Sequence, residues 1–195
     1  MTTSAPRRDH RRGFTLSEVL IASTLSAFVL AAVMSSFVFI GRTGFRASGV
    51  SEMENEVRRA LETFSQEARL ATDVRWNSAQ SLTLTLPAGS PAAQVTYAYD
   101  ADARSATYQC FYRVVGDASS TAARRALVRG VASDFAFRRY KLEQPGVSDN
   151  TAANDRETKQ IQIVLSAART SAVTAGTSQT IASSRYILRN KRVSN

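Results

Sequence analysis

A single carboxylate, Glu18, stands at the head of a long apolar stretch and is the residue whose position most needs a chemical explanation. The apolar stretch covers residues 19–40, and no charged residue lies between Glu18 and Arg42. A carboxylate at the edge of a bilayer is costly, so such a group usually has a functional partner. The alternative is that Glu18 belongs to a plain membrane anchor and reaches the lipid headgroups.

Three carboxylates in one polar loop are candidate metal ligands. Asp149, Asp155 and Glu157 lie beside Asn150 and Asn154, and hard oxygen ligands of this kind suit calcium. Their spacing matches no known calcium loop, however, and turn-forming polar residues explain the pattern better. We therefore expect a turn-rich surface loop in residues 145–158, with no metal.

Cys110 is the only cysteine, so the chain cannot form an intramolecular disulfide. It alternates with Tyr108 and Tyr112, which places the three side chains on one predicted inward face of a strand. Reactive cysteines need an exposed and electropositive setting. We expect Cys110 to be a buried structural thiol.

A basic stretch in the second half of the chain also contains aromatic residues. Its members are Arg124, Arg125, Arg129, Arg138, Arg139 and Lys141, with Phe135, Phe137 and Tyr140 among them. Such a combination can bind DNA through phosphate contacts and stacking. The alternation of Phe135 and Phe137 instead favours rings that point inward and arginines that are solvated, so nucleic acid is the less favoured partner. The formal net charge of +9 permits anionic partners but singles out none.

The apolar stretch itself predicts a membrane-spanning helix. At about 1.5 Å per residue, a helix over residues 19–40 is roughly 33 Å long, and a bilayer core is about 30 Å thick. Four arginines precede it: Arg7, Arg8, Arg11 and Arg12. Basic residues that flank a span are retained in the cytoplasm. We expect a single-pass membrane protein with a cytoplasmic N-terminus and a C-terminal domain on the other side of the membrane.

The segment Gly13-Phe14-Thr15-Leu16-Ser17-Glu18, followed by the apolar helix, resembles the prepilin processing motif of type IV pilins and type II secretion pseudopilins. In that family, a membrane prepilin peptidase cuts after the glycine and methylates the new terminal amine, and the glutamate is needed for assembly. The resemblance implies cleavage between Gly13 and Phe14, N-methylation of Phe14, and Glu18 as the assembly carboxylate. A conventional secretory signal is the rival, and it would be cut after the apolar stretch.

The resemblance also bears on the kind of subunit. Major pilins often carry a helix glycine and proline where this chain has Ala27 and Ser35, and many have a disulfide. Their absence weakens an assignment as a major subunit. Residues 61–69 resemble the stretch after the long helix in the larger minor pseudopilins, and residues 186–190 resemble the ends of those proteins and of some minor pilins. The resemblance therefore implies a minor pilin or a larger minor pseudopilin. His10 is the only histidine and would be lost with the leader, which excludes a Ser-His-Asp triad and most zinc sites from the mature chain. We expect neither enzymatic activity nor a cofactor.

Beyond the membrane, the hydrophobic period predicts that the helix continues. Gly41, Gly44 and Gly49 weaken a short patch, after which apolar residues recur at steps of three and four along one face. That stripe comprises Met53, Val57, Ala60, Leu61, Phe64, Ala68 and Ala71. On the opposite face we expect an ion pair between Glu54 and Arg58.

After residue 72 the period changes to two and predicts an antiparallel β domain. We expect strands at residues 81–86, 95–99, 108–112, 127–137, 160–165 and 186–188. Residues 116–121 and 169–179 are expected to be loops.

The whole pattern predicts an α+β, pilin-like fold: a long N-terminal helix packed on a C-terminal antiparallel sheet. Its expected parts are a cleaved leader (1–13), a transmembrane and assembly helix (14–40), its amphipathic continuation (41–72) and a periplasmic β domain (73–195). We expect a structural filament subunit whose partners are prepilin peptidase, other pilin or pseudopilin subunits and the inner membrane. The alternatives are an adhesive or DNA-binding minor pilin, or an anchored periplasmic domain that never assembles.

Overall fold

The structure is a computed structural model that describes residues 13–142, 149–170 and 177–192. The predicted leader, apart from Gly13, lies outside these residues, as do residues 145–148 of the loop predicted at 145–158 and residues 171–176 of the loop predicted at 169–179. The first element is α1, Leu16–Leu70, and the chain divides after Gly44 into two compact units. Gly41, Gly44 and Gly49 lie within α1 and do not end the helix.

In the second unit, α1 buries the predicted apolar stripe. Met53, Val57, Phe64 and Ala68 are all at most 4% exposed, which confirms the period of the sequence pattern. The predicted Glu54–Arg58 pair is wrong, because the Arg58 guanidinium instead lies 3.2 Å from the carboxylate of Glu62, one turn further on. Both groups are largely exposed, so this pair adds little stability.

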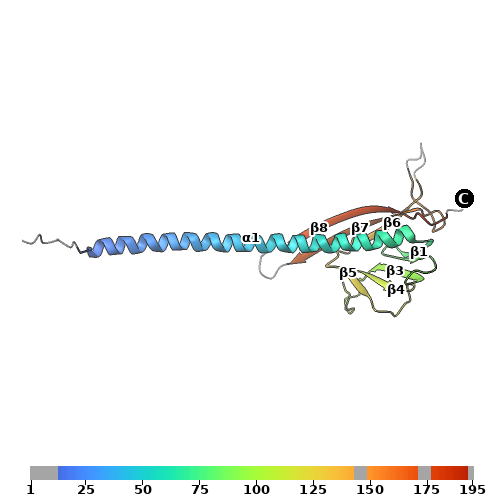
Figure 1. Cartoon of the computed structure of the whole chain (residues 1–195), viewed down its shortest axis with the longest axis horizontal. Coiled ribbons are helices and arrows are strands. Elements are labelled where there is room, and N and C mark those ends of the chain that lie inside the picture. The colour runs from blue at the N-terminus through green and yellow to red at the C-terminus, as the bar shows by residue number, and fades with distance from the viewer. Residues whose placement is uncertain (1–12, 143–148, 171–176, 193–195) are drawn as a thin grey trace, which may run out of the picture. The chain divides into compact units, whose positions relative to one another are not determined.

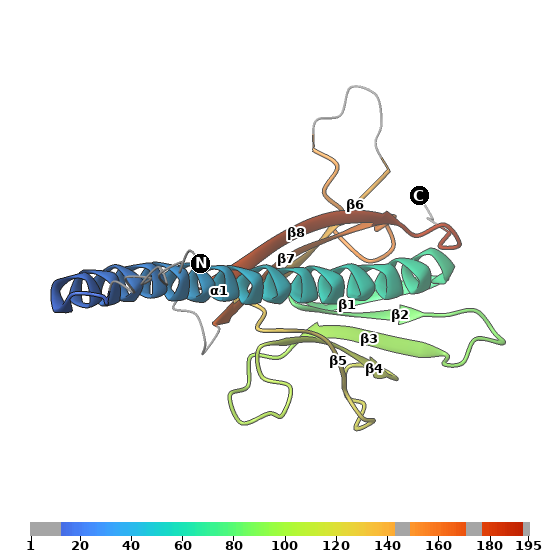
Figure 2. The same cartoon turned by 60° about the vertical axis from the view of Figure 1, so that its left-hand side comes forward.

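In the part of the chain that the structure describes, eight strands follow the helix. They confirm the α+β fold, but they form two antiparallel sheets. The strands are β1 (Asp73–Ser78), β2 (Ser81–Thr85), β3 (Gln94–Tyr99), β4 (Cys110–Val115), β5 (Arg125–Arg129), β6 (Ala136–Tyr140), β7 (Gln160–Thr170) and β8 (Thr177–Ile187). One sheet has the order β1-β2-β3-β4-β5 and the other β6-β7-β8. The second half of α1 lies between these two sheets (Figures 1 and 2).

The boundary between the sheets falls at Gly130, inside the stretch that the sequence suggested was one strand (127–137). Gly130 has a φ of +68°, a conformation that side chains disfavour. A Cβ there would lie 2.4 Å from the carbonyl oxygen of Ala168, so only glycine fits this approach of β5 to β7. The turn allows Val128 and Phe137 to reach the same core from different sheets.

Aromatic side chains join the helix to both sheets. The Phe64 ring is fully buried and lies 5.0 Å from the Tyr97 ring of β3, 5.9 Å from Phe137 of β6 and 5.4 Å from Tyr186 of β8, between ring centroids. Rings at these separations attract one another beyond their burial. Next to them, the Tyr97 hydroxyl donates to the Glu67 carboxylate, which Arg113 also contacts at 2.7 Å. Burial, followed by this hydrogen bond to Glu67, raises the pKa of Tyr97.

The C-terminal segment after β8 closes the end of the helix. The Asn190 side-chain amide donates to the carbonyl oxygen of Leu70 at 3.1 Å, one of the carbonyls that a helix end leaves without a partner. Lys191 is buried and its ammonium lies 2.9 Å from the Asp73 carboxylate, at the start of β1. These contacts attach the final residues to the junction between α1 and β1.

We expect Asn190→Ala to lower the free energy of unfolding by about 1 kcal/mol, because one side-chain hydrogen bond to the helix end is lost. For a domain of this size, that corresponds to a decrease of about 2–4 °C in Tm. Thermal unfolding of the detergent-solubilised chain measures it, with Arg189→Ala as the control, since that side chain is exposed. An unchanged Tm for Asn190→Ala would show that water replaces the amide at no cost.

Candidate functional site

The predicted cleavage site lies just outside the helix. Gly13, Phe14 and Thr15 are not helical, and α1 begins at Leu16. The Phe14 side chain is 86% exposed. A Cβ built on Gly13 meets no described atom within 4 Å, so the fold itself places no demand for glycine there.

Thr15 and Glu18 together cap the start of α1. The Glu18 carboxylate accepts a hydrogen bond from the Thr15 backbone N–H at 2.9 Å and another from the Thr15 hydroxyl at 2.8 Å. In return, the Glu18 N–H donates to the Thr15 hydroxyl oxygen at 3.3 Å. This reciprocal arrangement is a capping box, which satisfies donors that a helix start would otherwise leave free.

Glu18 therefore has hydrogen-bond donors within its own chain. The signal was visible in the sequence as a threonine followed three residues later by a glutamate, directly before an apolar run. Thr15 is therefore the site residue that the sequence analysis missed. Its two donors neutralise part of the cost of placing a carboxylate beside an apolar helix.

Thr15→Ala should loosen this first turn. Loss of an N-cap side chain costs about 1 kcal/mol, so local opening should become roughly fivefold more frequent. The amides of Glu18 and Val19 donate to the hydroxyl and carbonyl oxygens of Thr15, and their hydrogen exchange in detergent micelles should accelerate by that factor. Ser26→Ala is the matched control, because its hydroxyl bonds only within the helix, to the carbonyl oxygen of Ala22. Equal exchange rates in the two variants would contradict the capping role.

The helix that follows can cross a membrane by its length and composition. Its large apolar side chains are exposed throughout residues 19–40. The hydroxyls of Ser26 and Ser36 donate to carbonyl oxygens one turn earlier, at 2.8 and 3.0 Å. Because these polar groups are satisfied inside the helix, they can face lipid at low cost.

The basic stretch does not form one surface. Arg124 contacts the Asp100 carboxylate at 2.7 Å, and Arg139 contacts that of Asp155 at 2.9 Å. Lys141 contacts Glu157 at 3.0 Å. Burial raises the pKa of Asp100, but hydrogen bonds from Ser105 and Thr107 and the charge of Arg124 outweigh it and hold this pKa below its usual range.

The aromatic residues of the basic stretch do not form one surface either. Phe135 and Phe137 are 1% and 3% exposed, so both rings belong to the core, as their alternation predicts. Tyr140 lies under the Arg185 guanidinium, 4.0 Å from the ring centroid. The rings of Phe135 and Phe137 are therefore out of reach of a stacking base.

Asp155 of the acidic loop is engaged in hydrogen bonds, and Cys110 is buried. Asp155 accepts hydrogen bonds from the Trp76 backbone N–H and from Arg139, and no group of three or more potential metal ligands occurs in the part of the chain that the structure describes. Cys110 is 5% exposed, as expected, and burial raises the pKa of its thiol. Tyr108 was expected on the same inward face but is 44% exposed, because β4 begins only at Cys110.

Comparison with known proteins finds a family match at the N-terminus. Residues 8–34 match the family model described as the prokaryotic N-terminal methylation motif. That match includes Gly13, Phe14, the Thr15–Glu18 cap and most of the apolar stretch. No curated protein matches the chain. An exposed segment at residues 13–15, a capped helix start and an apolar helix thus coincide in this chain with a prokaryotic N-terminal methylation motif.

Proposed function

We propose that this chain is a pilin-type structural subunit that is anchored in the membrane, processed by prepilin peptidase and then assembled into a filament. The observation that carries the proposal is the methylation motif at residues 8–34, placed where the chain changes from an exposed, non-helical segment to a capped apolar helix. The α+β fold that follows in the chain supports a structural role.

In this proposal the peptidase hydrolyses the bond between the Gly13 carbonyl and the Phe14 nitrogen. The products are a leader that ends in the Gly13 carboxylate and a mature chain that begins with the Phe14 amine, which is then methylated. The glycine requirement belongs to the enzyme cleft, because the space around Gly13 is open among the described residues. Helix α1 begins beyond the bond and leaves it in an exposed, non-helical segment that a protease can bind.

Glu18 then has two sets of partners that compete. Within its own chain, the carboxylate is held by Thr15, one residue from the new Phe14 amine. In a bundle of identical apolar helices, the Phe14 amine of a neighbouring subunit can take over this carboxylate. Because a buried carboxylate without a cation costs several kcal/mol, such a pair fixes the axial register of the helices more than it adds net stability.

The proposal extends to the orientation in the membrane and to the kind of subunit. The N-terminus faces the cytoplasm and the β domain the periplasm, since the arginines precede the span. The absence of a helix glycine and proline at Ala27 and Ser35, and of a cysteine pair, favours a minor subunit of a type IV pilus or type II secretion filament.

The proposal is tested by removing the peptidase. In cells that express it, the chain should appear in the sheared or purified filament fraction together with other subunits. In cells without it, the chain should remain full-length in the inner membrane and be absent from that fraction. A chain that reaches the same fraction in both kinds of cell would contradict the proposed function.

A further inference from the structure

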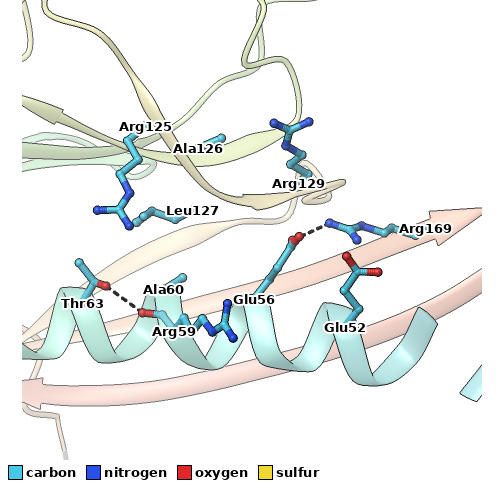
Figure 3. A pocket seen from close by; sticks show the side chains of 10 residues that line it. All are labelled: Glu52, Glu56, Arg59, Ala60, Thr63, Arg125, Ala126, Leu127, Arg129 and Arg169. Atoms are coloured by element: carbon cyan, nitrogen blue, oxygen red, sulfur yellow. Dashed lines mark hydrogen bonds and ion pairs between the residues drawn. The ribbon is translucent and has the colours of Figure 1, made fainter. Parts of the chain in front are cut away.

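Arginines that are left without a carboxylate gather at one cleft of the second unit. The cleft has a volume of about 580 Å³ and lies between α1 and the strands β5 and β7 (Figure 3). Its charged lining residues are Arg59, Arg125, Arg129, Arg169, Glu52 and Glu56. Arg169 lies 2.5 Å from Glu56, whereas no described carboxylate pairs with Arg59, Arg125 or Arg129.

A β-bulge in β5 sets the direction of Arg125 and Arg129. The pairing of β4 with β5 runs from Phe111↔Val128 to Tyr112↔Ala126, so Leu127 is an extra residue in β5. A bulge of this kind re-aims the residues on either side of it. Arg125 extends from β5 toward α1, while Arg129 points outward at the rim (Figure 3).

The opposite flank of the same helix segment is apolar and acidic instead of basic. There, Val57, Leu61 and Tyr186 line an apolar groove of about 340 Å³ between α1 and β8, with Glu54 and Glu62 at its rim. No described cation pairs with Glu54. Glu62 is held only by the exposed Arg58, and a pair of that kind exchanges partners at little cost.

The two flanks are opposed because of helical geometry. About 100° separates successive residues, so Glu52, Glu56 and Arg59 project to one side of the buried stripe, and Glu54, Leu61 and Ser65 to the other side. Both flanks occupy the same turns of α1. Copies that stand side by side can therefore bring the basic flank of one against the acidic flank of the next at the same height.

We propose that the arginine cleft docks the acidic flank of α1 from a second copy of this chain, so that Glu54 and Glu62 of that copy face Arg59 and Arg125, respectively. The charges of the two flanks are complementary, with four arginines against two glutamates on one side and two glutamates against one arginine on the other. The contact is heterologous, because it joins two different surfaces of the chain. The inference rests on the proposed function.

Disulfide crosslinking in full-length chains tests the contact. Two differently tagged chains are expressed together, each with Cys110→Ala so that only the new thiols react. One carries Ala126→Cys in the basic cleft and the other Ser65→Cys in the acidic groove. We expect a disulfide between the two chains and none between two Ala126→Cys chains, because a heterologous contact never brings the same flanks together.

Charge reversal supplies the decisive variants. Arg125→Glu in the first chain should abolish the crosslink, and so should Glu54→Lys with Glu62→Lys in the second, whereas the two changes together should restore it. Arg138→Glu, an exposed arginine outside the cleft, is the matched control and should leave the yield unchanged. Absence of the crosslink in the starting pair overturns the proposal. So does a crosslink that both reversals leave intact, or one lost only on reversal at Arg125.

The mass of the N-terminus, measured in the same cells, separates this proposal from the proposed function. Chains that begin at Phe14 but fail to crosslink overturn the docking surface alone. Chains that are never cut after Gly13 contradict the pilin-type role itself, whatever the crosslinks show.

Discussion

The Gly13→Val variant should keep its N-terminal segment and accumulate uncut in the membrane. The physical reason is local, because a β-branched side chain stiffens the backbone and crowds the scissile bond. The fold should not change, since a Cβ on Gly13 meets no described atom within 4 Å. N-terminal mass spectrometry reports the cleavage, and thermal unfolding of the β domain reports the fold.

Gly41→Val is the matched control for this variant. Gly41 is also surrounded by open space among the described residues, but it lies well within α1. The same substitution there should leave cleavage after Gly13 unchanged. If Gly13→Val is cut as fast as the wild type, the bond after Gly13 is not the processing site.

Glu18→Gln and Glu18→Ala should both be cut normally and both fail to enter filaments. The amide of glutamine retains an oxygen that can accept the Thr15 hydrogen bonds, but it has no charge to hold a neighbouring Phe14 amine. The Tm of the β domain should be unchanged in both variants, because Glu18 belongs to the first unit and the core lies in the second. Co-purification with other filament subunits, measured beside a cleavage assay, provides the comparison.

Thr15→Ala distinguishes the charge of Glu18 from its capping role. This variant loses the cap but keeps the carboxylate, so it should still assemble. If Glu18→Gln assembles like the wild type, the carboxylate only contributes to the cap and the register argument fails. If either Glu18 variant loses cleavage as well, Glu18 acts in recognition by the peptidase.

Periodicity was enough to predict the helix and its buried stripe, because the spacing of Met53, Val57, Phe64 and Ala68 is set by local geometry alone. Strand β1 was missed because the sequence signal is weak. Val74 is its only buried side chain, and Trp76 is half-buried. The strand exists because it pairs with β2 along Val74↔Leu84 and Trp76↔Leu82, and such tertiary pairing overrides local preference.

The division into two sheets could not be predicted from the sequence, because it also depends on tertiary contacts. It depends on the positive φ of Gly130 and on the approach of β5 to Ala168, nearly forty residues later. The ends of β7 and β8 were also misjudged, since small polar residues such as Ser178 and Thr180 extend a hairpin whose register runs from Gln160↔Ile187 to Thr170↔Thr177. No period-two hydrophobic pattern marks these extensions.

Local sequence was enough to find the N-terminal motif but not the arginine cleft. The positions of Gly13, Phe14 and Glu18 followed from a resemblance in adjacent residues, and the match at residues 8–34 covers them. The arginine cleft could not be foreseen, because it joins Arg59 of α1 to Arg125 of β5 and Arg169 of β7. The sequence grouped Arg125 instead with Arg124 and Arg139, which the fold pairs with distant carboxylates.

The N-terminal mass of the wild-type chain extracted from the membrane tests whether the chain is processed as a prepilin. We expect a mature chain that begins at Phe14 and carries one methyl group on its amine. A chain that begins at Met1, or one that begins beyond Ala32 after cleavage on the far side of the apolar stretch, would contradict this expectation.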